Sequence, residues 1–348
     1  MINYIDKIRI SAVMMVFFLH SFVFVGKDFA MSDIIKESSL CMIFFMPAWA
    51  GVWIFFVVSG YLAGIGFKTE KYKLTFWGVK EYFYKKIRRV YIPVILYICF
   101  CTVMLNPDFL ERWVVVRQFI FLTYRGIPGT NAMGATWFVF PLMLMYFTAP
   151  LLALLYKKFR KKTLAIMFVI VICGFVNRYL WYNIGGDWYE MYTSWLCNMD
   201  FFASGFGLAY LKDYLEWQKN KTIRYVFLMI FSGFVFFNCY IIAFQWNMGW
   251  YSWGFETIYL ILTCIYLYIF RANRGEKYNL PKVERFAKWF SVISFEFYFF
   301  HSNIFDRLCS HIGGHTAIEQ YVKFIIVTFI ITCIFAYGWH KMTGIKSN

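Results

Sequence analysis

The sequence predicts an all-α polytopic membrane protein of about ten transmembrane helices, with both termini in the cytoplasm and no soluble domain. Composition is the first reason: of 348 residues, 61% are hydrophobic, 24% aromatic and 16% charged, and the mean hydropathy is +0.56. Such values are typical of membrane proteins and exclude a water-soluble globular enzyme. The second reason is a series of long apolar segments. The third is the uneven distribution of lysine and arginine between the loops that join them.

Ten segments are apolar enough and long enough to cross the hydrocarbon core, which takes about 20 residues of helix. They are residues 10–26, 41–67, 90–105, 136–156, 163–184, 195–211, 223–244, 249–270, 286–308 and 318–340. No repeat or low-complexity tract divides the chain, so we expect residues 1–348 to form a single transmembrane domain. The stretch 106–135 contains Gly126, Pro128 and Gly129, which favours an interfacial or re-entrant piece rather than a span.

The basic residues predict the orientation. Of the 35 lysines and arginines, 27 lie in loops on the side of the N-terminus and 5 in the opposite loops. Basic loops stay in the cytoplasm, so both termini are expected there, which requires an even number of spans. The net charge of +16 then reflects topology and attraction to anionic membrane lipids, and no basic soluble domain points to nucleic acid. The cysteines are scattered without a C-x-x-C pair, so no metal site is expected.

The strongest candidate for chemistry is His20, an ionisable side chain inside the first apolar segment. Arg9 lies at the polar edge of the same segment, eleven residues earlier. Eleven residues of helix make about three turns and rise roughly 16 Å, so both side chains share one face. This pair suits a site that binds an anionic group at the membrane surface and reacts deeper in the membrane. The alternative is an arginine that reaches the interface and a histidine that only hydrogen-bonds between helices.

Further ionisable residues lie towards the extracytoplasmic ends of the later segments. They are Arg178, Asp200, Glu256, His301, Asp306 and Arg307. A polar chamber that opens outward explains their shared level, and simple pairing, such as Arg178 with Asp200, explains it equally. Glu296 lies nearer the middle of the membrane and roughly 140° around its helix from His301, so these two side chains are not expected to face one partner.

A basic cluster ends the loop 68–89, immediately before the third segment. It consists of Lys85, Lys86, Arg88 and Arg89. Such clusters mostly anchor the membrane edge, but they also bind phosphates, because arginine and lysine are good donors to polyanions at a low-dielectric boundary. The chain has no Walker-type loop and no G-x-G-x-x-G turn, so a nucleotide-like ligand would have to be bound by side chains.

Five motifs, in order, resemble the acyltransferase 3 family of bacterial integral-membrane acyltransferases. They are YIDKIRISAVMMVFFLH with Arg9 and His20, WIFFVVSGYL with Ser59 and Tyr61, KKIRRVYIP with the basic cluster, ATWFVFPLM with Trp137, and SFEFYFFH with Ser294, Tyr298 and His301. The resemblance runs from residue 4 to about residue 340. It departs from the family at the usual Arg-x-x-Arg, which here is either Lys85 with Arg88 or Lys86 with Arg89.

The resemblance implies transfer of an acyl group, most often acetyl, from cytoplasmic acetyl-coenzyme A to hydroxyls of extracytoplasmic or lipid-linked glycans, in the bacterial cytoplasmic membrane and without a metal. It implies that His20 is catalytic, as a general base or, alternatively, as the carrier of the acyl group. Arg9 and the basic cluster would bind the phosphates of coenzyme A, and Ser59 and Tyr61 would polarise the thioester carbonyl. The further candidates for shaping the acceptor site are Trp137, Glu256 and His301.

Two other functions fit the same scaffold. A secondary transporter or flippase for a polar or lipid-linked substrate would also need a polar path through the helices, although no paired halves with matching interruptions occur. A non-enzymatic assembly or sensory protein would be expected to lose Arg9 or His20, and this chain has both.

Overall fold

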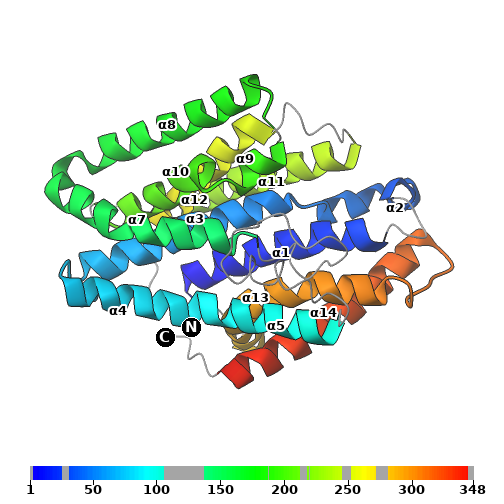
Figure 1. Ribbon diagram of the computed structural model, residues 1–348. Coiled ribbons are helices and arrows are strands. Elements are labelled where there is room, and N and C mark those ends of the chain that lie inside the picture. Colours follow the sequence, from blue (N-terminus) through cyan, green and yellow to red (C-terminus); the bar gives the residue numbers. More distant parts are fainter. Residues whose placement is uncertain are drawn as a thin grey trace. The chain divides into compact units, whose positions relative to one another are not determined.

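The computed structural model describes residues 3–25, 31–105, 137–186, 188–211, 218, 220–244, 252–271 and 281–343. Within these ranges the regular structure is entirely helical (Figure 1). The predicted interfacial segment 106–135 lies outside the described residues. The chain divides into two compact units, unit 1 (Met1–Phe55 and Lys212–Met342) and unit 2 (Phe56–Leu211 and Thr343–Asn348).

A helix occurs at each of the ten apolar segments. Six of these stretches are long and apolar enough to cross a membrane by length and composition: Tyr4–Phe24, Ser39–Lys68, Val139–Lys158, Arg160–Asn183, Lys221–Phe244 and Ala317–Thr343. The helices at the other four segments are α5 (Ile92–Leu105), α10 (Trp195–Leu208), α12 (Ser252–Phe270) and α13 (Pro281–Leu308). These four do not meet that criterion: α5 and α10 have 14 residues each, the apolar part of α12 is the shorter Gly254–Phe270, and α13 is long but not apolar enough. The chain is therefore a multi-pass membrane protein, and the count of ten and the orientation stay predictions.

Unit 1 contains the helix that carries both candidate residues of the first motif. Its elements are α1 (Tyr4–Val25), α2 (Met31–Glu37), the 3₁₀ helix η1 (Ser39–Phe44), the first part of α3 (Ala48–Lys68), α11 (Lys221–Phe244), α12, α13 and α14 (Ala317–Thr343). Helix α1 packs along α13 (Figure 1). The fully buried ring of Phe17 in α1 lies 5.3 Å from the ring of Phe297 and 5.0 Å from that of Phe305. Apolar and aromatic packing therefore holds α1 against α13.

Helices α1 and α13 run in the same direction. Arg9, near the start of α1, contacts Ser294, and His20, farther along, contacts His301. Parallel packing is what the first and ninth spans of a bundle that crosses the membrane alternately would show. It also brings two of the resemblance motifs into contact along one seam.

The second predicted segment, 41–67, is not one continuous helix. The 3₁₀ helix η1 ends at Phe44, and α3 begins at Ala48, directly after Pro47. Proline has no backbone N–H and disfavours the helical conformation in the residue before it, so a helix starts at it rather than running through it. The predicted span itself is retained, because the whole stretch Ser39–Lys68 is long and apolar enough to cross a membrane.

Unit 2 holds the remaining predicted spans around α10. Its elements are the rest of α3, α4 (Phe76–Lys86), the π-helix η2 (Ile87–Tyr91), α5, α7 (Val139–Lys158), η4 (Arg160–Lys162), α8 (Thr163–Asn183), α9 (Trp188–Thr193) and α10. Helix α10 packs against α8 and α7. A Cβ added at Gly60 of α3 would lie 2.0 Å from the carbonyl oxygen of Phe202, and one added at Gly205 would lie 2.0 Å from that of Val57. Glycine is therefore required where the backbones of α3 and α10 meet.

Glu37, the last residue of α2, caps the start of α14. Its Oε1 accepts a hydrogen bond of 2.9 Å from the N–H of Ala317, and Oε2 accepts one of 3.0 Å from the N–H of Ile318. A carboxylate is well placed there, because the first N–H groups of a helix have no partner within the helix and carry partial positive charge. These two backbone hydrogen bonds lower the pKa of Glu37 below its ordinary value of 4.5.

This cap predicts a pH-dependent part of the stability. Because the folded protein holds the pKa of Glu37 low, its contribution is complete above pH 4.5 and is lost as the pH falls below that value through the lowered pKa. We expect the difference in Tm between wild type and Glu37→Gln to be largest near neutral pH and to shrink in acid. Glu70→Gln, at an exposed turn, is the control. A Tm difference of the same size at every pH would rule out an ionised cap.

Candidate active site

Arg9 and His20 face the same helix, as their spacing in the sequence predicts. The guanidinium Nη2 of Arg9 donates a hydrogen bond of 3.3 Å to the hydroxyl of Ser294 in α13. Nδ1 of His20 lies 2.8 Å from Nε2 of His301 in the same helix. The side chains of Arg9 and His20 are both half-buried. The first and last motifs of the resemblance thus form one continuous row of polar contacts in unit 1.

The two imidazole rings meet edge to edge. Their planes are inclined by 17° and their centres lie 5.1 Å apart. The distance between the ring centres is close to the sum of the nitrogen–nitrogen distance of 2.8 Å and two ring radii. The two nitrogens therefore lie on the line between the ring centres, whereas stacked rings would lie face to face with an offset. The rings are therefore nearly coplanar, which suits a straight hydrogen bond between the two nitrogens.

The surroundings of Arg9 include an acid that the sequence analysis did not single out. Ser294 donates its hydroxyl proton to the carbonyl oxygen of Ser291, over 2.9 Å, so its oxygen is left to accept from Arg9. The hydroxyl of Ser291 in turn donates to Oδ1 of Asp6, over 2.7 Å. Asp6 precedes Arg9 by three residues, a spacing that places both on one side of a helix and could have indicated this contact.

Glu296 and His301 do not share a partner, as predicted. His301 faces α1, whereas Oε1 of Glu296 lies 2.8 Å from Nδ1 of His340 in α14. Glu296 is 4% exposed, so this contact supplies a partner for an acid that would be costly to bury alone. The sequence analysis missed His340. The only feature of the sequence that could have indicated His340 is that histidine is rare in this chain, with five in total.

The remaining candidates, for polarising the thioester or for shaping the acceptor site, are distributed over both units. Glu256 lies on α12 of unit 1 and is fully buried. Ser59 is half-buried and Tyr61 buried on α3 in unit 2. Also in unit 2, the ring of Trp137 packs on that of Tyr192, with the centres 4.5 Å apart. Their part in substrate binding stays a prediction.

The basic cluster is divided by the π-helix η2. In α4, Nζ of Lys85 contacts Oε1 of Glu81 at 2.5 Å. Nζ of Lys86 lies 4.2 Å from the ring centre of Tyr146 and 5.4 Å from that of Tyr82. Burial lowers the pKa of Lys86, and the two ring faces supply cation–π attraction in partial compensation. Lys85 is therefore already paired with a carboxylate, whereas the contacts described for Lys86 are with aromatic rings.

Arg88 and Arg89 lie in the π-helix itself and are exposed. A π-helical turn inserts an extra residue and rotates the side chains that follow, and such turns are frequent at functional sites. The positive charge of Arg89 is among the influences that lower the pKa of Lys86, so these two cations lie near each other. Lys85 and Arg88 have the same spacing of three residues, so both registers left open by the sequence stay possible.

Arg178 and Asp200 are a structural ion pair inside unit 2. The guanidinium donates to both carboxylate oxygens, over 2.9 and 2.8 Å, and Nη1 also donates to the carbonyl oxygen of Cys197, over 2.6 Å. Both side chains are 2% exposed. Simple pairing, one of the two explanations considered for these residues, therefore accounts for them, and they provide no free charge for a substrate.

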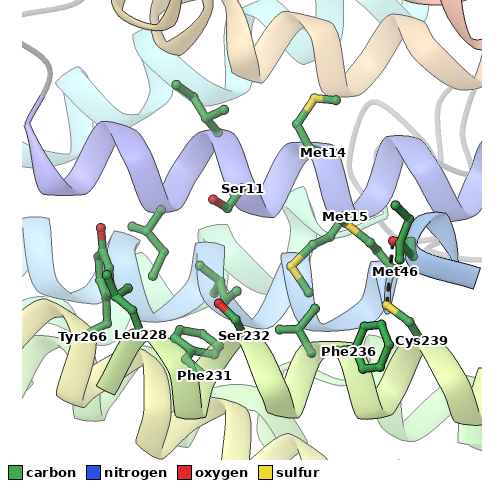
Figure 2. Close-up of a pocket in the computed structure, with 15 residues that line it drawn as sticks. Ser11, Met14, Met15, Met46, Leu228, Phe231, Ser232, Phe236, Cys239 and Tyr266 are labelled. Carbon is green, nitrogen blue, oxygen red and sulfur yellow. Dashed lines mark hydrogen bonds between the residues drawn. The ribbon is translucent and has the colours of Figure 1, made fainter. Parts of the chain in front are cut away.

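An apolar cavity of about 510 Å³ lies between α1 and α11. Figure 2 shows Ser11 and Met15 of α1 across from Phe231 and Ser232 of α11. Ser11 and Met15 point roughly 200° and 240° around α1 from Arg9. The cavity is thus on the opposite side of α1 from Arg9 and His20. Its methionine, isoleucine and phenylalanine lining suits hydrocarbon rather than a charged donor.

Comparison with known proteins agrees with the motif order. A family model described as an acyltransferase domain, Acyl_transf_3, matches residues 2–337. Neither the search of curated proteins nor the search of solved structures gave a match. The matched range contains every candidate residue that the sequence predicted and all of the helices except the last residues of α14. Because the match covers nearly the whole chain, this multi-pass membrane protein belongs to the acyltransferase 3 family and is an acyltransferase.

Proposed function

We propose that the protein transfers an acyl group, in the first instance acetyl, from cytoplasmic acyl-coenzyme A to a hydroxyl of an extracytoplasmic or lipid-linked glycan, in the bacterial cytoplasmic membrane. One observation carries this proposal beyond family membership: His20 is held by a nitrogen–nitrogen contact of 2.8 Å, on the face of α1 that also presents Arg9. The contact to His301 alone would equally suit a histidine that only hydrogen-bonds between helices, so the face shared with Arg9 is the part that supports a catalytic base.

In the proposed reaction His20 acts as general base. A ring nitrogen of His20 takes the proton from the glycan hydroxyl while the hydroxyl oxygen attacks the thioester carbonyl carbon. The tetrahedral intermediate then collapses, the carbon–sulfur bond breaks, and the imidazolium returns its proton to the departing thiolate of coenzyme A. Protons balance over the cycle, and no step changes an oxidation state. Such a base typically supplies about 10²–10⁴-fold in rate.

Arg9 is proposed to bind a phosphate of the acyl-coenzyme A. It lies roughly 16 Å along the helix from His20, a distance that the slender pantetheine arm of coenzyme A spans when extended. Three successive hydrogen bonds, through Ser294 and Ser291, connect Arg9 with Asp6 and orient the row. In unit 2 we propose three further phosphate-binding residues, Lys86, Arg88 and Arg89. Arg88 and Arg89 are exposed, and the contacts described for Lys86 are with aromatic rings.

We predict that Arg9→Ala weakens binding of acetyl-coenzyme A to the detergent-solubilised protein by roughly tenfold or more, because a charged hydrogen bond contributes about 1.5–3 kcal/mol. Wild-type affinity should also fall with added salt, since phosphate contacts near the surface are screened over roughly 8–10 Å. Equilibrium titration measures both effects. Lys7→Ala, one basic residue on another face of α1, is the matched control. Equal affinity of Arg9→Ala and wild type would leave Arg9 with a role in topology alone.

The proposed acceptor is tested by mass analysis of surface glycans from cells with and without the gene. The proposal predicts a glycan whose mass differs by one acyl group, present only when the gene is expressed. The size of the mass difference identifies the acyl group, and fragmentation identifies the sugar that carries it. Identical glycans in both strains, with the protein present in the membrane, would contradict a glycan acceptor.

A further inference from the structure

His301 has a proton position that its surroundings determine. Its Nδ1 lies 2.5 Å from the backbone carbonyl oxygen of Tyr298, one turn earlier in α13. A carbonyl oxygen only accepts hydrogen bonds, so Nδ1 of His301 must carry a proton. His301 is 1% exposed, and the partners described for it are His20, Tyr298, Ser302 and the ring of Phe305, none of which is an acid. A neutral ring is the form that such a site favours.

The proton position in His301 determines that in His20. A neutral imidazole has one N–H, so Nε2 of His301 carries a lone pair. Nδ1 of His20 lies 2.8 Å from that nitrogen, and two lone pairs do not face each other at this distance. Nδ1 of His20 must therefore donate. Since neutral His20 also has only one N–H, its Nε2 is unprotonated and able to accept a proton.

We infer that His301 is a positioning residue that fixes the tautomer of His20, so that Nε2 of His20 is the nitrogen that takes the proton from the acceptor hydroxyl. The inference rests on the proposed function only for the final step. The hydroxyl of Ser302, 3.2 Å from Nε2 of His301, is a second donor to the same lone pair. This second hydrogen bond leaves the assignment of His20 unchanged, because Nε2 of His301 still has to accept from Nδ1 of His20.

A neutral histidine suits this position in a membrane protein. In soluble hydrolases the residue that orients a catalytic histidine is usually a buried carboxylate. Within a membrane a second buried charge is costly unless it is paired. The Tyr298 carbonyl and the His301 ring orient His20 without adding one. When His20 takes up a proton, its Nδ1–H becomes a charged donor, and the hydrogen bond to His301 strengthens.

The tautomer is measured directly by ¹⁵N NMR of the full chain labelled at histidine. His20→Ala identifies the His20 signals by their loss. The expected result is a protonated Nδ1 and an unprotonated Nε2 on His20 in the wild type, and a mixture of tautomers in His301→Leu. A wild-type His20 that carries its proton on Nε2 would overturn the inference. This readout needs no activity, so it stands or fails separately from the proposed reaction.

Acyl-transfer rates then separate positioning from packing. His301→Leu should lower kcat by about 10–100-fold, the usual cost of losing a group that orients a reacting residue. His301→Gln should recover most of the rate, because its Oε1 accepts from Nδ1 of His20, whereas a packing role would favour the apolar leucine. In a His20→Ala background, His301→Leu should add no further loss. His311→Leu, at an exposed turn, is the control. Equal rates for the leucine and glutamine variants would overturn the inference.

Discussion

Replacing His20 with alanine should reduce acyl transfer by about 10²–10⁴-fold while leaving the amount of protein in the membrane unchanged. The reason is that His20 is the only titratable side chain of α1 placed deep in the span and held by a contact to α13. The half-buried ring is small, so its loss should cost little stability. Transfer of radiolabel from acyl-coenzyme A to glycan, in membranes adjusted to equal protein, measures the effect.

His311→Ala is the matched control for this substitution. His311 lies in the exposed turn after α13, where its Nδ1 is 2.9 Å from the carbonyl oxygen of Arg307. We expect this variant to keep the wild-type rate. More than about a tenth of wild-type activity in His20→Ala would contradict a general-base role, since the smallest typical loss is larger.

Among the substitutions proposed for this protein, removing one charge from the ion pair between Arg178 and Asp200 should cause the largest decrease in the free energy of unfolding. In Asp200→Asn the guanidinium, 2% exposed, loses its counter-charge, and breaking a buried pair in this way typically costs about 3–5 kcal/mol. The site has little room to adapt, because a Cβ at Gly174 would already lie 2.4 Å from the carboxylate carbon of Asp200. Equilibrium unfolding in mixed micelles measures the free energy of unfolding.

Two comparisons isolate the charge from the change of shape. The exposed pair of Lys36 and Asp33 is the control, and Asp33→Asn there should cost less than about 1 kcal/mol. Replacing both Arg178 and Asp200 by apolar residues, as Met and Leu, should recover part of the loss, because no unpaired charge is then left buried. An Asp200→Asn protein as stable as wild type would contradict a structural role for the pair.

The sequence predicted the helical class and the places of the helices, because apolar length is a local property. It did not predict where helices begin and end when local geometry intervenes. Pro47 divides the second segment, and η2 introduces a π-helical turn before α5. A sequence pattern does not report the hydrogen-bond register within a helix, so the rotation that η2 gives to Arg88 and Arg89 could not be foreseen.

The candidate site was predictable where it depends on spacing within one helix, and unpredictable where it depends on packing. The shared face of Arg9 and His20 follows from eleven residues of α-helix. The contact between His20 and His301 joins positions 281 residues apart in the sequence. The same limit applies to Glu296 and His340, which lie on different helices. Arg178 and Asp200 were predicted as one of two alternatives, and only the packing of α8 on α10 decides between them.

Sealed vesicles of known orientation distinguish an acyl-coenzyme A-dependent enzyme from a transporter most directly. A cysteine introduced at Lys161, in the exposed element η4, reports the orientation through a membrane-impermeant thiol reagent. Radiolabelled acetyl-coenzyme A is then supplied only at the face where Lys161 is labelled. We predict that label appears on the glycan together with an equal amount of free coenzyme A, and that His20→Ala gives neither. Movement of an unmodified substrate across the membrane without release of coenzyme A, from folded protein, would contradict the proposed function.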